Sequence, residues 1–97
     1  IFRFSATTDS GLSTLRDTIT DFDASSVNEV IFLDGLLNGV FQSGISAGGN
    51  TGFTATTEGS DTQVLIDTLG DGTADMEILL QNVSSGDVDI TDFLVTS

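Results

Sequence analysis

Two apolar stretches with a two-residue period, joined by a segment rich in turn residues, place the strongest constraint on the fold. Val64 and Ile66 alternate with their neighbours, and residues 76–80 repeat the pattern as Met-Glu-Ile-Leu-Leu. Residues 68–74 between them read Thr-Leu-Gly-Asp-Gly-Thr-Ala. Gly and Asp favour the tight turns that join antiparallel strands. These residues therefore predict a β-hairpin.

The two-residue alternation recurs elsewhere, whereas helical periodicity is poor almost throughout. Phe2 and Phe4 form a strand-like start, and residues 28–33 form a nearly continuous apolar run typical of a strand buried on both faces. Further strands are expected at residues 17–22, 53–57 (a weak, edge-like strand) and 89–95. The length allows one domain, residues 1–97. The sequence thus predicts an all-β fold, a small antiparallel β-sandwich of about six or seven strands.

Two segments are expected to be less regular. Residues 36–41 carry apolar side chains at helical spacing, but Gly35 and Gly39 flank or interrupt them, which indicates one short helical turn or a packed loop. Residues 44–52 contain Gly-Gly-Asn and predict a flexible connection.

The charge balance is extreme. Fifteen acidic residues face only Arg3 and Arg16, giving a formal net charge of −13 with no Lys and no His. Nucleic acids and anionic membranes are disfavoured as partners, because both are bound through Lys and Arg. No apolar run approaches the roughly 20 residues that span a bilayer, so membrane insertion is not expected. A hard divalent cation such as calcium would relieve the repulsion, while solubility alone also accounts for an acidic surface.

The candidate calcium ligands are four aspartates near the start of the chain: Asp9, Asp17, Asp21 and Asp23. Calcium takes about six to eight oxygens from carboxylates, backbone carbonyls and water, and these side chains would supply part of such a shell. The plain alternative is that all four cap turns and face water. Zinc held by thiolates or imidazoles is excluded because the chain has no Cys and no His.

A second acidic group, Asp67, Asp71 and Asp75, invites comparison with the calcium loop of an EF-hand. If Asp67 is position 1, Leu69 falls where a carboxylate or amide is needed and Ile78 falls where the bidentate Glu belongs. Two key ligands are therefore missing. The sequence favours a hairpin turn in which Asp and Gly serve the backbone geometry.

Catalysis is not expected. Paired carboxylates such as Asp21 and Glu29 serve glycoside hydrolysis in principle. No imidazole, thiol or lysine is present to complete other catalytic groups, and a chain of this length leaves little room for a substrate cleft beside a core.

Several segments, in order, resemble the C-terminal domain of serralysin-type metalloproteases and other RTX (repeat-in-toxin) proteins. They are residues 2–6 with Asp9-Ser10, then 17–22 ("D-x-I-x-D-F"), 29–33 (the "D-x-I-x-L" strand, with Asn28-Glu29 where Asp-Lys is commoner), 71–78 (close to "D-G-x-A-D-F") and 90–95 ("x-x-D-F-x-x"). The glycine-rich nonapeptide G-G-x-G-x-D and the protease signature H-E-x-x-H are both absent. Any repeats would precede Ile1, which we interpret as a cut end.

The resemblance implies an end cap of a parallel β-roll, secreted to the extracellular space or the bacterial cell surface. It implies a calcium ligand role for Asp9 and Asp17, and less clearly for Asp21 and Asp23. It further implies partners in the preceding RTX β-roll or catalytic domain and in the type I secretion machinery. The uncleaved secretion signal would include Asp92, Phe93, Leu94 and Val95. As a matter of structure, Ile90, Phe93 and Val95 would also bury well in a final strand.

Two functions therefore follow from the sequence. The first is a non-catalytic C-terminal domain that assists calcium-dependent folding and addresses the protein for export. The second is a structural or adhesion module, such as a subunit of a surface layer, a fibre or an RTX adhesin, that acts by self-assembly.

Overall fold

The computed structural model describes residues 2–12, 16–23 and 29–97. Within these ranges the regular structure is β-strand with three short 3-10 helices and no α-helix. The strands are β1 (Phe2–Phe4), β2 (Asp17–Ile19), β3 (Ile31–Leu33), β4 (Phe41–Ser43), β5 (Thr51–Glu58), β6 (Asp61–Asp67), β7 (Met76–Leu80) and β8 (Phe93–Val95). The 3-10 helices are η1 (Thr7–Ser10), η3 (Ser85–Asp87) and η4 (Ile90–Asp92). The prediction of an all-β fold is confirmed.

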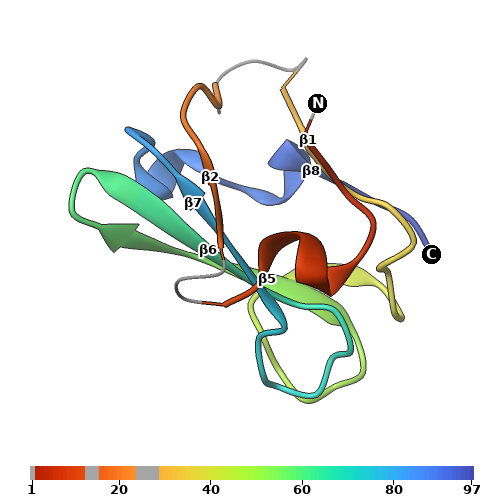
Figure 1. Ribbon diagram of the computed structural model, residues 1–97. Helices are drawn as coiled ribbons and strands as arrows, with labels where there is room; N and C mark the ends of the chain where they lie inside the picture. Colours follow the sequence, from red (N-terminus) through yellow and green to blue (C-terminus); the bar gives the residue numbers. More distant parts are fainter. Residues whose placement is uncertain (1, 13–15, 24–28) are drawn as a thin grey trace.

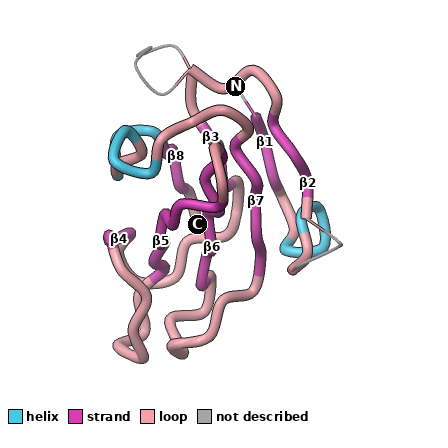
Figure 2. Tube along the Cα trace, turned by 90° about the vertical axis from the view of Figure 1, so that its left-hand side faces the viewer, coloured by secondary structure: helices cyan, strands magenta, loops and turns pink. Residues whose placement is uncertain are grey.

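The strands form two sheets (Figures 1 and 2). The smaller sheet has the order β1-β3-β8, and both of its strand pairs are parallel. The larger sheet has the order β2-β7-β6-β5-β4. Its central pairs β5–β6 and β6–β7 are antiparallel, whereas β2–β7 and β4–β5 are parallel. The prediction of an antiparallel fold is therefore wrong outside β5–β6–β7. Alternation along a strand reports which face is buried, and it carries no information about the direction of the neighbouring strand.

The hairpin predicted from the alternation is confirmed as β6 and β7. Val64 lies opposite Ile78 and Ile66 opposite Met76, so the apolar residues of the two strands share one face. All five residues of β7 are buried. Met76, Ile78 and Leu80 belong to the core cluster, while Ser10 and Arg16 contact Glu77.

One apolar core joins both sheets. Ile31 and Leu33 of the smaller sheet and Ile66 and Ile78 of the larger sheet have no exposed surface and belong to the same cluster. Aromatic rings extend this core: the centroid of Phe53 in β5 lies 4.6 Å from that of Phe93 in β8 and 5.4 Å from that of Phe41 in β4. Such aromatic pairs add about 0.5–1.5 kcal/mol beyond the burial of their area. Strand β8 of the smaller sheet is thereby packed against β4 and β5 of the larger sheet.

Several predicted boundaries need correction. Strand β5 is longer than the predicted segment 53–57 and is an interior strand, because β4 and β6 pair with its two edges. Residues 36–40 form a loop, which is one of the two alternatives expected for this segment. The predicted strand 28–33 is observed as β3, and its first residue, Asn28, lies outside the described residues, as does Ile1.

The C-terminal strand is also shorter than predicted, because η4 occupies residues 90–92. The Asp89 carboxylate accepts a hydrogen bond from the backbone N–H of Thr91 at 3.0 Å, and the Asp92 carboxylate accepts one from that of Asp89 at 2.8 Å. This reciprocal cap favours a helical turn over an extended chain. It leaves Ile90 42% exposed, which contradicts its expected burial.

Arg16, just before β2, contacts two other strands of the larger sheet. Its Nη1 lies 2.6 Å from Oε2 of Glu77, a buried side chain of β7, and its Nη2 lies 2.6 Å from Oε2 of Glu58 at the end of β5. Hydrogen bonds from Arg16 lower the pKa of Glu58, and the same contacts raise the pKa of Arg16. The Ser10 hydroxyl donates to the backbone carbonyl of Glu77 and accepts from the N–H of Asp17. The segment before β2 therefore contacts both the side chain and the backbone of Glu77 in β7.

The loop between β4 and β5 packs against the β6–β7 loop. The backbone N–H of Gly49 donates to the carbonyl of Gly70 at 2.9 Å. The side-chain amide of Asn38 donates to the carbonyls of Gly49 and Leu69, at 3.2 and 3.0 Å. The Thr51 hydroxyl donates to the carbonyl of Thr68 at 2.9 Å. These contacts fix the position of the β6–β7 loop.

Replacement of Gly70 tests this packing. Gly70 has a φ of +70°, and an added Cβ would lie 2.2 Å from the backbone nitrogen of Asn50. Gly35 has a similar φ of +77° but open space around its Cβ position. We expect G35A to lower the free energy of unfolding by about 1–2 kcal/mol, the cost of a left-handed alanine, and G70A to lower it by about 3 kcal/mol or more, because steric overlap is added. Urea unfolding of both variants measures this difference, and equal losses would show that the two loops do not pack as described.

Candidate functional site

Three carboxylates converge in the β6–β7 loop. Asp67 ends β6, Asp71 lies in the turn and Asp75 immediately precedes β7. One carboxylate oxygen from each lies within 4.8 Å of the other two. Asp67 is buried, Asp75 is half-buried and Asp71 is exposed. The group therefore runs from the protein interior to the surface.

The same carboxylates hold the loop backbone. The oxygens of Asp67 accept hydrogen bonds from the N–H groups of Gly70 at 2.9 Å and Gly72 at 2.8 Å. Asp75 accepts from the backbone N–H of Thr68 at 2.9 Å, which closes the neck of the loop. This agrees with the interpretation of the segment as a hairpin turn in which Asp and Gly serve the backbone geometry. The sequence suggested a comparison with a calcium loop, but the apolar residues at positions 69 and 78 favoured a plain turn, so a cluster of three carboxylates was not predicted.

Asp67 is ionised despite its burial. Loss of solvent is the largest single influence and raises its pKa, but the N–H groups of Gly72, Gly70 and Asp71 together outweigh it, so the pKa lies below its usual value. The two arginines of the chain are engaged elsewhere: Arg3 contacts Asp34, and Arg16 contacts Glu58 and Glu77. The negative charge of the three aspartates is thus not balanced by a basic side chain.

The donor set fits a hard cation. All three side chains offer oxygen, which is the ligand atom that calcium and magnesium prefer, and loop carbonyls and water complete such shells. The group has the donor atoms and spacing to hold a metal ion. It is not an EF-hand, because Leu69 is exposed and Ile78 is fully buried in the core, so neither position offers a ligand.

The four predicted calcium ligands do not form such a group. Among residues 2–12, 16–23 and 29–97, the cluster of three acidic side chains is the one in the β6–β7 loop. Asp9 caps the turn of η1 and accepts hydrogen bonds from the backbone N–H groups of Ser5 at 3.0 Å and Ala6 at 3.2 Å. Asp17, Asp21 and Asp23 are exposed. A calcium role for these four residues stays a prediction.

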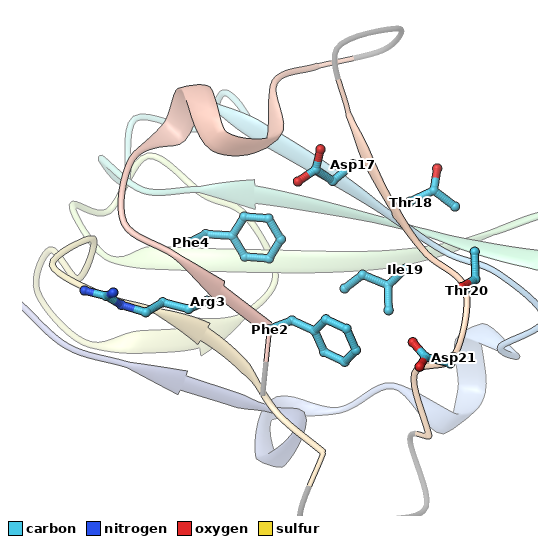
Figure 3. Close-up of a pocket in the computed structure, with 8 residues that line it drawn as sticks. All are labelled: Phe2, Arg3, Phe4, Asp17, Thr18, Ile19, Thr20 and Asp21. Carbon is cyan, nitrogen blue, oxygen red and sulfur yellow. The ribbon is translucent and has the colours of Figure 1, made fainter.

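Asp17 and Asp21 line a cleft between β1 and β2 (Figure 3). The cleft has a volume of about 420 Å³, and Phe2 and Phe4 of β1 form its opposite wall. The side chains of Asp17, Ile19 and Asp21 point towards β1, whereas those of Thr18 and Thr20 point away from it (Figure 3). The cleft thus combines apolar and acidic side chains.

The predicted secretion signal lies in the last turn and strand. Asp92 and Phe93 are buried, Val95 is half-buried and Leu94 is 49% exposed. Burial raises the pKa of Asp92, although the hydrogen bond from the backbone of Asp89 opposes this effect. Strand β8 pairs with β3 through the partners Phe93 and Ile31. In the folded domain this segment is therefore part of the smaller sheet.

Comparison with protein-family models, with curated proteins and with solved structures gave no match. No helix in the described part of the chain is both long enough and apolar enough to cross a bilayer.

The buried carboxylate of Asp67 makes stability depend on pH. Because its pKa is lower in the folded chain, its contribution is fully present above the unfolded pKa of about 3.9 and is lost as the pH falls through the folded value. We expect D67N to lower the free energy of unfolding at neutral pH by about 1–3 kcal/mol, since a buried loop N–H loses its acceptor. The difference from the parent should shrink below about pH 4. Urea unfolding across this range measures it, and a constant difference at all pH values would contradict the assignment.

Proposed function

We propose that this chain is the non-catalytic C-terminal domain of a secreted RTX-type protein, and that calcium assists its folding. The observation that carries the proposal is the convergence of Asp67, Asp71 and Asp75 in one packed loop of a chain with a net charge of −13. The order of family-like segments supports the same conclusion. Its role would be to cap the preceding part of the protein and to assist export.

Calcium would act through simple linkage. A cation that binds the folded loop, but not the unfolded chain, stabilises the fold by about 1.4 kcal/mol when its concentration is tenfold above the dissociation constant. Such an increment matters for a small domain, whose total stability is typically about 5–15 kcal/mol. Where calcium is scarce, repulsion between the carboxylates weakens the fold. Where calcium is plentiful, as outside the cell, the ion offsets that repulsion.

The smaller sheet supports the capping role. Its three short strands are parallel, and β1 pairs only with β3 in the described chain. The free edge of β1 offers backbone groups to a further parallel strand, such as the last strand of a β-roll. This domain, paired through β1 with the last strand of the β-roll, would cover the open end of the roll. That open edge would otherwise promote aggregation. Residues 92–95 would serve as the type I secretion signal before the chain folds.

Calcium-dependent stability is the first test. The melting temperature should be several degrees higher in millimolar calcium than in chelator or in matched magnesium, because Mg²⁺ sheds its water reluctantly and demands stricter geometry. D71N should remove most of this increase, since it removes charge from the cluster without burying a new group. D87N is the matched control, because Asp87 is exposed and lies outside the cluster. Equal melting temperatures in calcium and chelator would contradict the proposal.

Export is tested separately. A passenger protein followed by residues 1–97 should be released by cells that carry a type I exporter, and deletion of residues 92–95 should abolish release. An internal control with alanine at the exposed Leu69, outside the proposed signal, should be exported normally. Retention of the intact fusion would remove the signal from the proposal.

The alternative function is a structural or adhesion module that acts by assembly. Strands β4 and β8 each form one edge of a sheet, and β8 carries the exposed side chain of Leu94. Unpaired edges with apolar side chains favour pairing between chains. Light scattering that rises with protein concentration, and falls for L94K, would favour this alternative over a solitary cap.

A further inference from the structure

The edges of two sheets face each other across the cleft in Figure 3. Among the described residues, β1 pairs only with β3 and β2 pairs only with β7. Each strand therefore has one edge without a neighbouring strand. The volume of about 420 Å³ lies between them and is lined by residues 2–4 and 17–21. This size falls within the range of about 300–1,000 Å³ that is common for ligand-binding clefts.

The outer edge of β2 offers backbone hydrogen-bonding groups at Thr18. The carbonyl of Ile19 accepts from the N–H of Gln81 after β7, and the N–H of Asp17 donates to the Ser10 hydroxyl that also contacts β7. Backbone groups of successive residues in a strand point to opposite edges. The N–H and carbonyl of Thr18 therefore point away from β7. They point towards the position that an added strand would occupy.

The side chains along β2 define what such a strand would carry. Asp17, Ile19 and Asp21 point towards β1, so the pattern along this face is acidic, apolar, acidic (Figure 3). Neighbouring strands place side chains of the same face about 4.5–5.5 Å apart, and opposite charges there are favourable. A complementary strand has basic, apolar and basic residues at every second position. Its apolar side chain would contact Ile19 and the Phe2 ring across the cleft.

The charge of the cleft favours a basic partner segment over a second copy of this chain. Within residues 2–12, 16–23 and 29–97, the carboxylates of Asp17 and Asp21 make no hydrogen bond or ion pair. Arg3, the basic residue that lines the cleft, already contacts Asp34, with its Nε and Nη2 at 2.9 and 2.5 Å from Oδ2. A second copy of this chain would bring another −13 charges. A cationic segment would instead be attracted.

We propose that the free edge of β2 is a docking site for an extended, basic segment of a partner protein, which adds as a further strand to the larger sheet. Its backbone pairs with Thr18, its basic side chains lie beside Asp17 and Asp21, and its central apolar side chain enters the cleft. This is recognition by strand addition, in which backbone bonds supply affinity and alternate side chains supply specificity. It is independent of the cation proposed for the β6–β7 loop.

A synthetic peptide tests the site. The probe is a short, end-capped peptide with the central sequence Lys-Thr-Val-Thr-Lys, titrated into the whole chain in chelator so that no divalent cation competes. We expect saturable binding that weakens with added salt, and amide chemical-shift changes in NMR spectra centred on residues 2–4 and 16–21. Peptides with Glu in place of Lys, or with Val moved by one position, are the matched controls and should not bind. Absence of binding, or equal binding of the control peptides, would overturn the proposal.

Variants of β2 test the contribution of its acidic side chains and of its backbone separately. D17N and D21N should each weaken binding by about two- to fivefold. T18P removes the outward N–H while leaving the contacts of Asp17 and Ile19 with β7 in place, and a strand edge tolerates proline. It should weaken binding by about tenfold. D87N should have no effect. Shift changes at other strands, or self-association at this edge without peptide, would assign the edge to a different partner and overturn the proposal.

Discussion

A buried carboxylate in a central strand sets the arrangement of the N-terminal part of this protein. Glu77 lies in β7, where all five side chains are buried, and a buried carboxylate is costly unless a basic group reaches it. Arg16 is one of two basic residues in the chain, and its contacts at 2.6 Å with Glu77 and Glu58 place the start of β2 at the edge of β7. The contact of Ser10 with the backbone of Glu77 continues the attachment into η1. Without this arginine, the parallel β2–β7 pair would depend on three residue pairs and on the hydrogen bonds of Ser10.

The β6–β7 loop joins two requirements in one set of side chains. Asp67 and Asp75 accept backbone hydrogen bonds from Gly72 and Thr68, and the carboxylates of these two residues and Asp71 repel one another at short range. The carboxylates that fix the conformation of the turn therefore also destabilise it by their mutual repulsion. Any bound cation would act on the same atoms that shape the loop, so that binding and folding of this loop are coupled.

The sequence predicted the parts of the fold that depend on local pattern. The β6–β7 hairpin follows from the alternation of Val64 and Ile66 with their neighbours, and β1 follows from Phe2 and Phe4. The parallel pairing of β1, β3 and β8 was not predicted, because it joins Phe2, Ile31 and Phe93, which no local pattern relates. The spacing of the aspartates at 67, 71 and 75 did suggest a metal loop, but the apolar residues at positions 69 and 78 pointed to a plain turn. Their proximity depends on the path of the turn, in which Gly70 and Gly72 adopt left-handed conformations.

The smaller sheet also bears on how the chain reaches its folded state. Its central strand, β3, has one neighbour from the beginning of the sequence and the other from the end. Contacts between such distant segments require the closure of long loops before they contribute stability, and folds rich in them form slowly. During synthesis from the N-terminus, β3 would remain without β8 until residues 93–95 had left the ribosome. Until β8 is added, the chain would be incompletely paired, and part of the core that Phe93 covers would be exposed to solvent.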